Sequence, residues 1–223
     1  MIFENLKKTY GEKTVLDIDK IEFDLGKIYA IVGANGSGKS TFLKVIAKQI
    51  KSDEKANLDF DGKKVCYMPQ KSFAFKMTTY KNVLLATKGR EEDKARADKL
   101  MCELKIDHLA DQKANALSGG ETARMALCRT IMNGAEVLLL DEPTAAMDIE
   151  STKITEDVIV KQKTEGKTIV IVTHSMSQAR RIADEVVFMK DGKVIERGEI
   201  SSILDNPKTS EMKEFLEFFS SEI

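Results

Sequence analysis

The sequence predicts an α/β fold in which a mainly parallel sheet is flanked by helices. Apolar runs at residues 28–32, 137–140 and 168–173 have the length of buried parallel strands, and each precedes a helical pattern. Residues 2–24 indicate an antiparallel β region, whereas residues 71–116 contain no strand pattern. We therefore expect one domain, with a core formed by residues 1–70 and 134–223 and an inserted helical subdomain over about 71–133.

Composition and charge exclude several classes of protein. The chain has 223 residues, a net charge of −1 and 42% hydrophobic residues, which suits a globular protein rather than a basic nucleic-acid binder. No apolar run approaches the ~20 residues of a membrane span, and residues 1–11 carry charges where a signal peptide needs an apolar segment. We therefore expect a cytosolic protein. The scattered cysteines, Cys66, Cys102 and Cys128, are expected to be buried thiols rather than zinc ligands or disulfides.

The N-terminal region reads as two strands, residues 2–8 and 15–24, joined by a turn at Gly11 and Glu12. Tyr10 lies just before this turn. Its ring could stack on a nucleotide base, since every base offers a π-face, or it could simply cover the end of the sheet. The spacing alone leaves both interpretations open.

A glycine-rich turn follows the strand at residues 28–32 and has the pattern G-x-x-x-x-G-K-S over residues 33–40. Glycines let backbone N–H groups converge on phosphate oxygens, and the helix that follows, over residues 41–47, adds unsatisfied donors and the positive end of its dipole. Lys39 is expected to reach the β- and γ-phosphates, and the hydroxyl of Ser40 is expected to bind Mg²⁺. The pattern therefore predicts a nucleotide phosphate site.

Residues 57–60 and 64–68 are expected to form two strands, joined as a hairpin by Asp61 and Gly62. Gln70 follows where the second strand leaves the sheet. Its amide could bind a metal-bound or attacking water, or it could be an ordinary polar loop residue.

Helices are expected over residues 79–86 and 91–104, with charged residues on their outer faces. Four large apolar side chains precede or begin this region: Phe73, Phe75, Met77 and Tyr80. They could form a docking patch for a partner or a small internal core of the helical part.

Ser118 is placed to cap a helix, with Glu121 three residues later at the spacing of a capping box. Gly119 and Gly120 begin that helix, which creates a second potential anion site. The alternative is a well-capped helix with no ligand.

Polar residues end two further strands. Asp141 and Glu142 follow an apolar strand at the sheet edge where open α/β sheets bind ligands. Because neighbouring residues on a strand point in opposite directions, Asp141 is expected to hold the Mg²⁺ shell and Glu142 to reach a water aligned with the γ-phosphate. His174 ends the strand at 168–173 as a hydrogen-bonding group or a structural histidine, whereas His108 is expected on the surface.

The C-terminal part is expected to contain a helix over residues 176–184 and a hairpin of residues 185–189 and 193–197 across Asp191 and Gly192. The tail, residues 211–219, places apolar residues on one helical face for packing on the sheet, namely Met212, Phe215, Leu216 and Phe219.

Taken together, these motifs resemble the nucleotide-binding subunit of ABC transporters over nearly the full length of the chain. Residues 33–40 resemble the family's Walker A motif, Gln70 its Q-loop and residues 117–121 its signature motif. Residues 140–142 resemble Walker B, residues 145–148 the D-loop and His174 the H-loop. The resemblance implies a P-loop NTPase core with an N-terminal antiparallel β subdomain and an inserted helical subdomain.

The resemblance also implies an ATPase that uses ATP and Mg²⁺. Glu142 would be the catalytic base, assisted by His174 and Gln70, and the metal would be held by Ser40, Gln70 and Asp141. The resemblance places an adenine-stacking aromatic at Tyr10. The residues expected to bind ATP are Tyr10, Gly33, Asn35, Gly36, Ser37, Gly38, Lys39, Ser40, Thr41, Ser118, Gly119 and Gly120.

In the family, two such subunits pair head to tail, so the resemblance implies a homodimer in which Ser118, Gly119 and Gly120 act on the ATP of the partner. Transmembrane permease subunits would dock near Phe73, Phe75, Met77 and Tyr80, with an extracytoplasmic solute-binding protein as an indirect partner and no nucleic acid. The protein would then lie in the cytoplasm, peripheral on the inner face of the cell membrane.

Some features depart from the family's usual pattern. Glu121 replaces the commoner glutamine, and Met147 stands where a leucine usually precedes the D-loop aspartate. Residues 113–116 lack the exporter-type Val-Gly-Glu segment, which together with the short helical part favours an importer of a small solute such as tungstate, another oxyanion or a polar amino acid. An exporter ATPase, or a soluble ABC protein acting as a nucleotide-gated switch, is the alternative.

Overall fold

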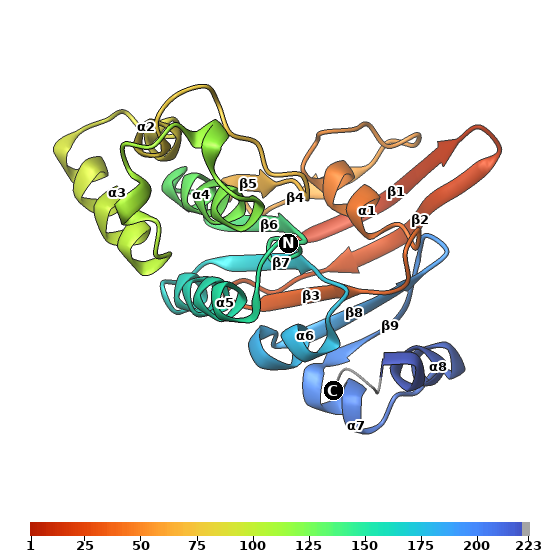
Figure 1. Cartoon of the computed structure of the whole chain (residues 1–223). Coiled ribbons are helices and arrows are strands. Elements are labelled where there is room, and N and C mark those ends of the chain that lie inside the picture. The colour runs from red at the N-terminus through yellow and green to blue at the C-terminus, as the bar shows by residue number, and fades with distance from the viewer. Residues whose placement is uncertain (220–223) are drawn as a thin grey trace.

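Two β-sheets organise the molecule in the computed structural model, which describes residues 1–219 (Figure 1). The smaller sheet is antiparallel with the strand order β2-β1-β4, and the larger has the order β5-β6-β7-β3-β8-β9. All neighbours in the larger sheet are parallel except β8 and β9, which form a hairpin. The strands are β1 (Ile2–Tyr10), β2 (Lys13–Glu22), β3 (Ile28–Val32), β4 (Asn57–Asp59), β5 (Val65–Met68), β6 (Val137–Asp141), β7 (Thr168–Val172), β8 (Glu185–Lys190) and β9 (Lys193–Glu199). The predicted α/β class is confirmed.

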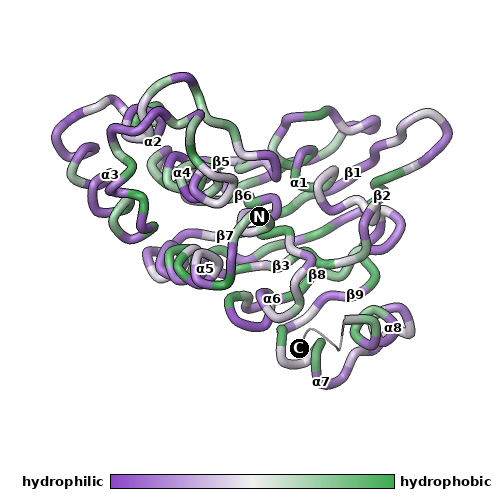
Figure 2. Tube along the Cα trace, viewed as in Figure 1, coloured by the Kyte–Doolittle hydropathy of each residue, from purple (hydrophilic) through white to green (hydrophobic). Residues whose placement is uncertain are grey.

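The three central strands, β3, β6 and β7, are buried along their whole length. Alternate residues of these strands enter two separate cores because side chains on a strand alternate between its faces. Ile28 and Ala30 pack with the apolar residues of the helices on one face, whereas Tyr29 and Ile31 pack with the first helix and the smaller sheet on the other. Figure 2 shows hydrophobic residues gathered on these central strands.

Helices cover both faces of the larger sheet (Figure 1). Apolar residues of α1 pack with those of β1 and β2, whereas apolar residues of α3 to α8 share the core on the opposite face. The helices are α1 (Lys39–Ile46), α2 (Thr79–Leu84), α3 (Glu91–Glu103), α4 (Gly119–Met132), α5 (Ile149–Thr164), α6 (Met176–Ile182), α7 (Ile200–Asp205) and α8 (Ser210–Phe219), with short 3₁₀ turns at Asp107–Leu109 and Ala114–Ala116.

One predicted supersecondary unit is wrong. Residues 57–60 and 64–68 do not pair as a hairpin, although Asp61 and Gly62 do form a turn with positive φ angles. β4 instead adds to β1 of the smaller sheet, and β5 pairs with β6 of the larger sheet. The chain therefore passes from one sheet to the other at this turn. The partners of β4 and β5 are distant in the sequence, so the Asp-Gly dipeptide alone does not determine them.

The cysteine prediction is partly wrong. Cys128 is buried and Cys66 is half-buried, but Cys102 is exposed on α3. Burial raises the pKa of the Cys128 thiol well above its usual range, because the thiolate loses its hydration. The thiol of Cys102 lies on the side of α3 that faces away from the apolar core, so helix periodicity determines its exposure.

The C-terminal helix packs on the sheet as expected. Met212, Phe215 and Leu216 of α8 are buried, and the ring centroid of Phe215 lies 4.9 Å from that of Phe188 on β8. The side chain of Phe219 lies outside the described residues. Within residues 1–219, no helix combines the length and the apolar character needed to cross a bilayer.

Candidate functional site

The glycine-rich turn joins β3 to α1 and has a backbone path that excludes side chains at two positions. A Cβ on Gly33 would lie 2.1 Å from the carbonyl oxygen of Met189, and a Cβ on Gly38 would lie 2.5 Å from that of Val15. Both glycines have positive φ angles. Gly38 precedes α1 and contributes no side-chain cap, so the N–H groups of the first turn point into the loop without an intrahelical partner, as an anion site requires.

Lys39 lies inside this loop and is only 5% exposed. Its Nζ donates hydrogen bonds to the carbonyl oxygens of Gly33, at 2.8 Å, and Ala34, at 2.9 Å. Burial lowers the pKa of Lys39, while the charges of Glu142 and Asp141 oppose the shift. The ammonium is thus held close to the loop by neutral acceptors.

Asp141 ends β6 and is 1% exposed. Its Oδ1 accepts a hydrogen bond from Ser40 Oγ at 2.9 Å, and its Oδ2 accepts one from Tyr67 OH at 3.1 Å. Burial raises the pKa of Asp141, although these two hydrogen bonds oppose the shift. Tyr67, on β5, was not singled out in the sequence, because a half-buried aromatic in a strand is usually a packing residue.

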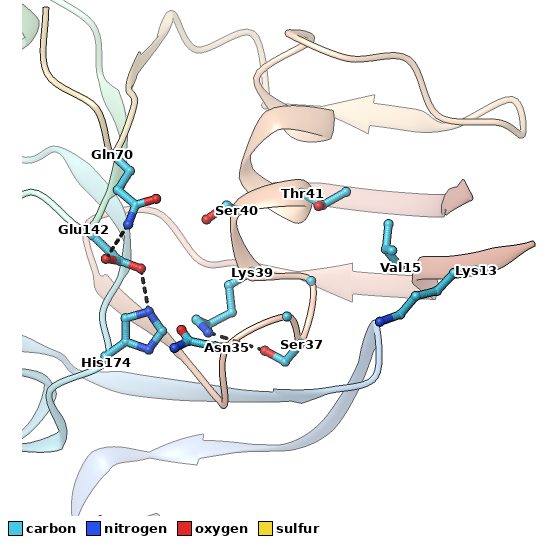
Figure 3. A pocket seen from close by; sticks show the side chains of 12 residues that line it. Lys13, Val15, Asn35, Ser37, Lys39, Ser40, Thr41, Gln70, Glu142 and His174 are labelled. Atoms are coloured by element: carbon cyan, nitrogen blue, oxygen red, sulfur yellow. Dashed lines mark hydrogen bonds and ion pairs between the residues drawn. The ribbon is translucent and has the colours of Figure 1, made fainter. Parts of the chain in front are cut away.

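Glu142 lies at the centre of a three-residue cluster (Figure 3). Its Oε2 accepts a hydrogen bond from Gln70 Nε2 at 2.8 Å, and its Oε1 lies 2.6 Å from His174 Nε2. The three side chains follow β5, β6 and β7, which are neighbours in the sheet. The φ angle of Glu142 is +49°, in the left-handed region; this turn ends the strand and directs the carboxylate toward its two partners.

A cavity of about 550 Å³ connects the loop with this cluster, a size typical of small-molecule sites. The sequence predicted most of the residues that line this cavity, with the exception of Lys13 and Val15 of β2. No sequence pattern marks these two residues, because only folding brings the β1–β2 hairpin beside the loop. The lining residues are Lys13, Val15, Asn35, Gly36, Ser37, Gly38, Lys39, Ser40, Thr41, Gln70, Glu142 and His174.

Several expected ligands do not line this cavity. Gly33 and Asp141 are instead hydrogen-bonded to the lining residues Lys39 and Ser40. Tyr10 is 56% exposed at the end of β1, with the Lys8 ammonium 5.6 Å from its ring centroid. Ser118, Gly119 and Gly120 form the separate N-terminus of α4. There Ser118 Oγ accepts from the Glu121 backbone N–H at 3.3 Å, and Glu121 Oε2 accepts from the Ser118 N–H at 2.8 Å. The predicted capping box is therefore present.

The charge of Glu121 should make a small, pH-dependent contribution to stability. The hydrogen bond from the Ser118 backbone lowers the pKa of Glu121. The stabilisation is therefore complete above the pKa that Glu121 has in the unfolded chain. It is lost as the pH falls through the lower pKa that Glu121 has in the folded protein. Because Gln also completes a capping box, Glu121→Gln should remove only the charge term. We expect a loss of about 0.3–1 kcal/mol at neutral pH, near the lower end for an exposed group, and no difference in acid.

Urea denaturation of wild type and variant across the pH range measures this difference. Glu12→Gln, in the exposed β1–β2 turn, is the control and should show no such dependence. A stability difference for Glu121→Gln that stays constant from neutral to acidic pH would contradict the assignment.

The fold and the cavity define a nucleotide-binding α/β protein with an ordered carboxylate beside its phosphate loop. Residues 16–145 match the family model described as ABC transporter, and the chain belongs to this family of ATP-binding subunits. It is 40% identical to the tungstate uptake system ATP-binding protein TupC of Peptoclostridium acidaminophilum, over 85% of this chain and 94% of that protein. It is 35% identical to the glutamate transport ATP-binding protein GluA of Corynebacterium glutamicum, over 95% of both.

Among solved structures, the chain is similar to a dimeric ATP-binding cassette in a post-hydrolysis state bound to ADP and Pi. The TM-score is 0.79 at 28% sequence identity, and the match covers 90% of this chain and 99% of the cassette. The P-loop NTPase fold and the ATPase class expected from the sequence are thereby confirmed.

Proposed function

We propose that this chain is the ATP-hydrolysing subunit of an ABC importer and that ATP binds in the cavity beside Lys39. The observation that carries the proposal is the convergence of Gln70 and His174 on Glu142, at the edge of the sheet that also bears the phosphate loop. Two hydrogen-bonding partners fix a carboxylate there, with 11% of its side chain exposed. Such a carboxylate suits proton transfer from a water molecule.

The phosphates would take over the contacts that Lys39 makes with the loop carbonyls. The lysine stays where it is and exchanges neutral acceptors for anionic ones, which gives a stronger, charge-assisted hydrogen bond. Burial already disfavours its charged form, so an anion in the loop offsets that cost. We propose that Tyr10 stacks on the adenine. Tyr10 pairs with Lys13 across the β1–β2 hairpin, and Lys13 lines the cavity.

The pair formed by Ser40 and Asp141 fits Mg²⁺, which prefers oxygen ligands and usually keeps water and phosphate oxygens in its shell. Ser40 would ligate the ion directly, while Asp141, already in contact with Ser40 Oγ at 2.9 Å, would hold bound water. Within residues 1–219 no group of three or more His, Cys, Asp or Glu side chains could hold a metal by itself. The phosphates would then complete the shell, with Gln70 nearby. When bound, the ion neutralises charge that develops on the β- and γ-phosphates.

Glu142 would accept a proton from the attacking water as the water oxygen bonds to the γ-phosphorus, while the bond from that phosphorus to the bridging oxygen breaks and ADP leaves with the electron pair. His174 and Gln70 would keep the carboxylate oriented toward the phosphate, and each could shift its hydrogen bond to the water or to a γ-phosphate oxygen. Because these groups follow the adjacent strands β5, β6 and β7, their spacing is fixed by the sheet before nucleotide binds.

Two copies of the chain would complete each ATP site. The N-terminus of α4 presents the exposed Ser118 and Gly119, and these residues do not line the cavity that Lys39, Ser40 and Glu142 share. A head-to-tail homodimer places this second anion site against the γ-phosphate of the partner's ATP, where added N–H donors and exclusion of water favour the reaction. Closure of the dimer would move residues 71–133 together with their membrane partner.

The membrane partner would dock on a patch of Phe73, Phe75, Met77 and Tyr80. Phe73 and Phe75 are 59% and 43% exposed, with ring centroids 4.9 Å apart. Asn82, fully buried, clamps the backbone of Phe75 through Oδ1 and Nδ2 at 2.9 and 3.1 Å, and Arg129 of α4 donates to the carbonyl oxygen of Phe73 at 2.8 Å. Two aromatic rings held outward in this way are typical of an interaction surface rather than of an internal core.

The transported solute would be a small oxyanion or a polar amino acid, as the names of the tungstate and glutamate relatives suggest. The permease would hold the chain at the cytoplasmic face of the membrane, and an extracytoplasmic binding protein would deliver the solute to that permease.

Affinity purification from detergent-solubilised membranes tests the assembly. The tagged wild-type chain should recover an integral membrane protein in comparable amount, and Phe75→Ser should lose most of it while leaving the ATPase activity of the purified chain unchanged. Leu25→Ser, with a side chain of matched exposure (42%) outside the patch, is the control. Recovery of ribosomes instead would support the switch interpretation, and full recovery with Phe75→Ser would contradict the patch.

A further inference from the structure

A polar network lies behind the Glu142–His174 pair and joins three segments of the chain. Its centre is Gln178 of α6, which follows His174 by four residues and is 2% exposed. Gln178 Nε2 donates to Thr144 Oγ1 at 3.0 Å and to Glu156 Oε1 of α5 at 3.1 Å. Thr144 in turn follows Glu142 by two residues, so a single amide nitrogen links the loop of the carboxylate to the helix that begins beside the histidine.

The far end of this network is rigid. Glu156 is 4% exposed, and its two carboxylate oxygens accept from Arg181 Nη2 at 2.7 Å and Arg181 Nε at 2.8 Å. A bidentate pair of this kind fixes geometry as well as charge. Because Glu156 can only accept, the nitrogen and not the oxygen of the Gln178 amide must face it, which also directs that nitrogen toward Thr144.

A second cavity, of about 240 Å³, lies at the same place. The residues that line it include Glu142 and His174 together with Thr144, Gln178 and Arg181. Apart from Ala145, the residues that line this cavity are polar, so the loop of Glu142 and α6 meet there through polar side chains. Gln178 Oε1 is buried and has no hydrogen-bond partner among residues 1–219, so Nε2 is the amide atom that ties Gln178 to the loop.

We propose that Thr144 and Gln178 are positioning residues that hold Glu142 and His174 at hydrogen-bond distance for the hydrolysis step. Neither residue lines the cavity of the phosphate loop; they act through the two loops that carry the pair. The proposal rests on the proposed function, in which that pair performs the chemistry. We call the hydrogen bond from Gln178 to Thr144 the strap. Without it, the Glu142 loop, which leaves its strand with a positive φ angle, would lose this side-chain contact with α6.

Thr144→Val tests this directly, because it removes the hydroxyl while keeping the shape, and Thr144→Ser is the matched control because it keeps the hydroxyl. We expect Thr144→Val to lower kcat by about tenfold with KM for ATP within about twofold, since small misplacements of reacting groups lower the rate steeply while the phosphate loop is untouched. Thr144→Ser should retain most of the activity. Gln178→Met, which cuts the same link from the other side, should reproduce the defect of Thr144→Val.

A spectroscopic readout separates this inference from the proposed function. The chain has two histidines, His108 and His174, so ¹⁵N-histidine labelling gives two imidazoles that a His108→Gln variant assigns. Thr144→Val and Gln178→Met should shift the Nε2 signal of His174 and leave that of His108 in place, whereas Thr144→Ser should leave both.

An unmoved His174 signal in both variants would overturn the strap. If the His174 signal moves in these variants and kcat stays unchanged, the strap does position His174. The proposed function then fails, because the position of the Glu142–His174 pair would not affect hydrolysis. A KM increase with kcat unchanged would also overturn the proposal, because it would place the effect on nucleotide binding.

Discussion

Replacing Glu142 by Gln should lower kcat for ATP hydrolysis by about 10²–10⁴-fold, the usual contribution of a general base, while ATP still binds. The amide has nearly the same shape, and its single oxygen can still accept from either Gln70 or His174, which now lie 2.8 and 2.6 Å from the carboxylate. What the amide cannot do is take a proton from water. Bound ATP would persist, so the dimer that ATP closes should accumulate and be measurable by size-exclusion chromatography.

The control for this prediction is Glu136→Gln, which makes the same chemical change at a carboxylate that is 53% exposed and paired with Lys63. It should hydrolyse ATP at the wild-type rate. Turnover by Glu142→Gln within a few-fold of wild type would contradict the assignment of the base, and failure of the variant to bind ATP would show that the carboxylate contributes to the phosphate site instead.

The positions of the reacting groups could be predicted from the sequence, but their contacts could not. Gln70, Glu142 and His174 were each expected at a strand end because an apolar run stops before each of them. Their convergence depends on β5, β6 and β7 being neighbours, and this order comes from pairing between distant segments, such as Val65 with Val137. A single sequence carries no local signal for that order.

The two kinds of error have the same physical origin. Asp61 and Gly62 have the composition of a hairpin turn, and they do form a turn, yet β4 and β5 pair with strands from elsewhere in the chain. Lys13 and Val15 enter the site because the β1–β2 hairpin folds against the phosphate loop. In both cases the turn was predicted and the partner of the flanking strands was not, since the free energy that selects the partner comes from burying the larger apolar faces.

A mixture of two defective subunits should regain ATP binding if each site is shared between two copies of the chain. Lys39→Ala removes the buried ammonium from the phosphate loop and should weaken ATP binding by about 10²-fold or more, as expected for one partner of a buried charge pair. Ser118→Asp keeps a good helix cap but places a negative charge against the partner's γ-phosphate. Ser118→Asn is the control, because it also caps α4 and adds no charge.

Subunits carrying Lys39→Ala and subunits carrying Ser118→Asp, both in the Glu142→Gln background that retains ATP, should each fail alone. Mixed dimers would combine both defects in one site and leave the other intact. Random pairing of equal amounts makes about half of the dimers mixed, so about a quarter of all sites should retain ATP after rapid gel filtration. Retention near zero in the mixture would contradict the shared site, because a site built within one subunit would carry a defect in every copy. If Ser118→Asp retained ATP as well as Ser118→Asn, the N-terminus of α4 would not face the phosphates.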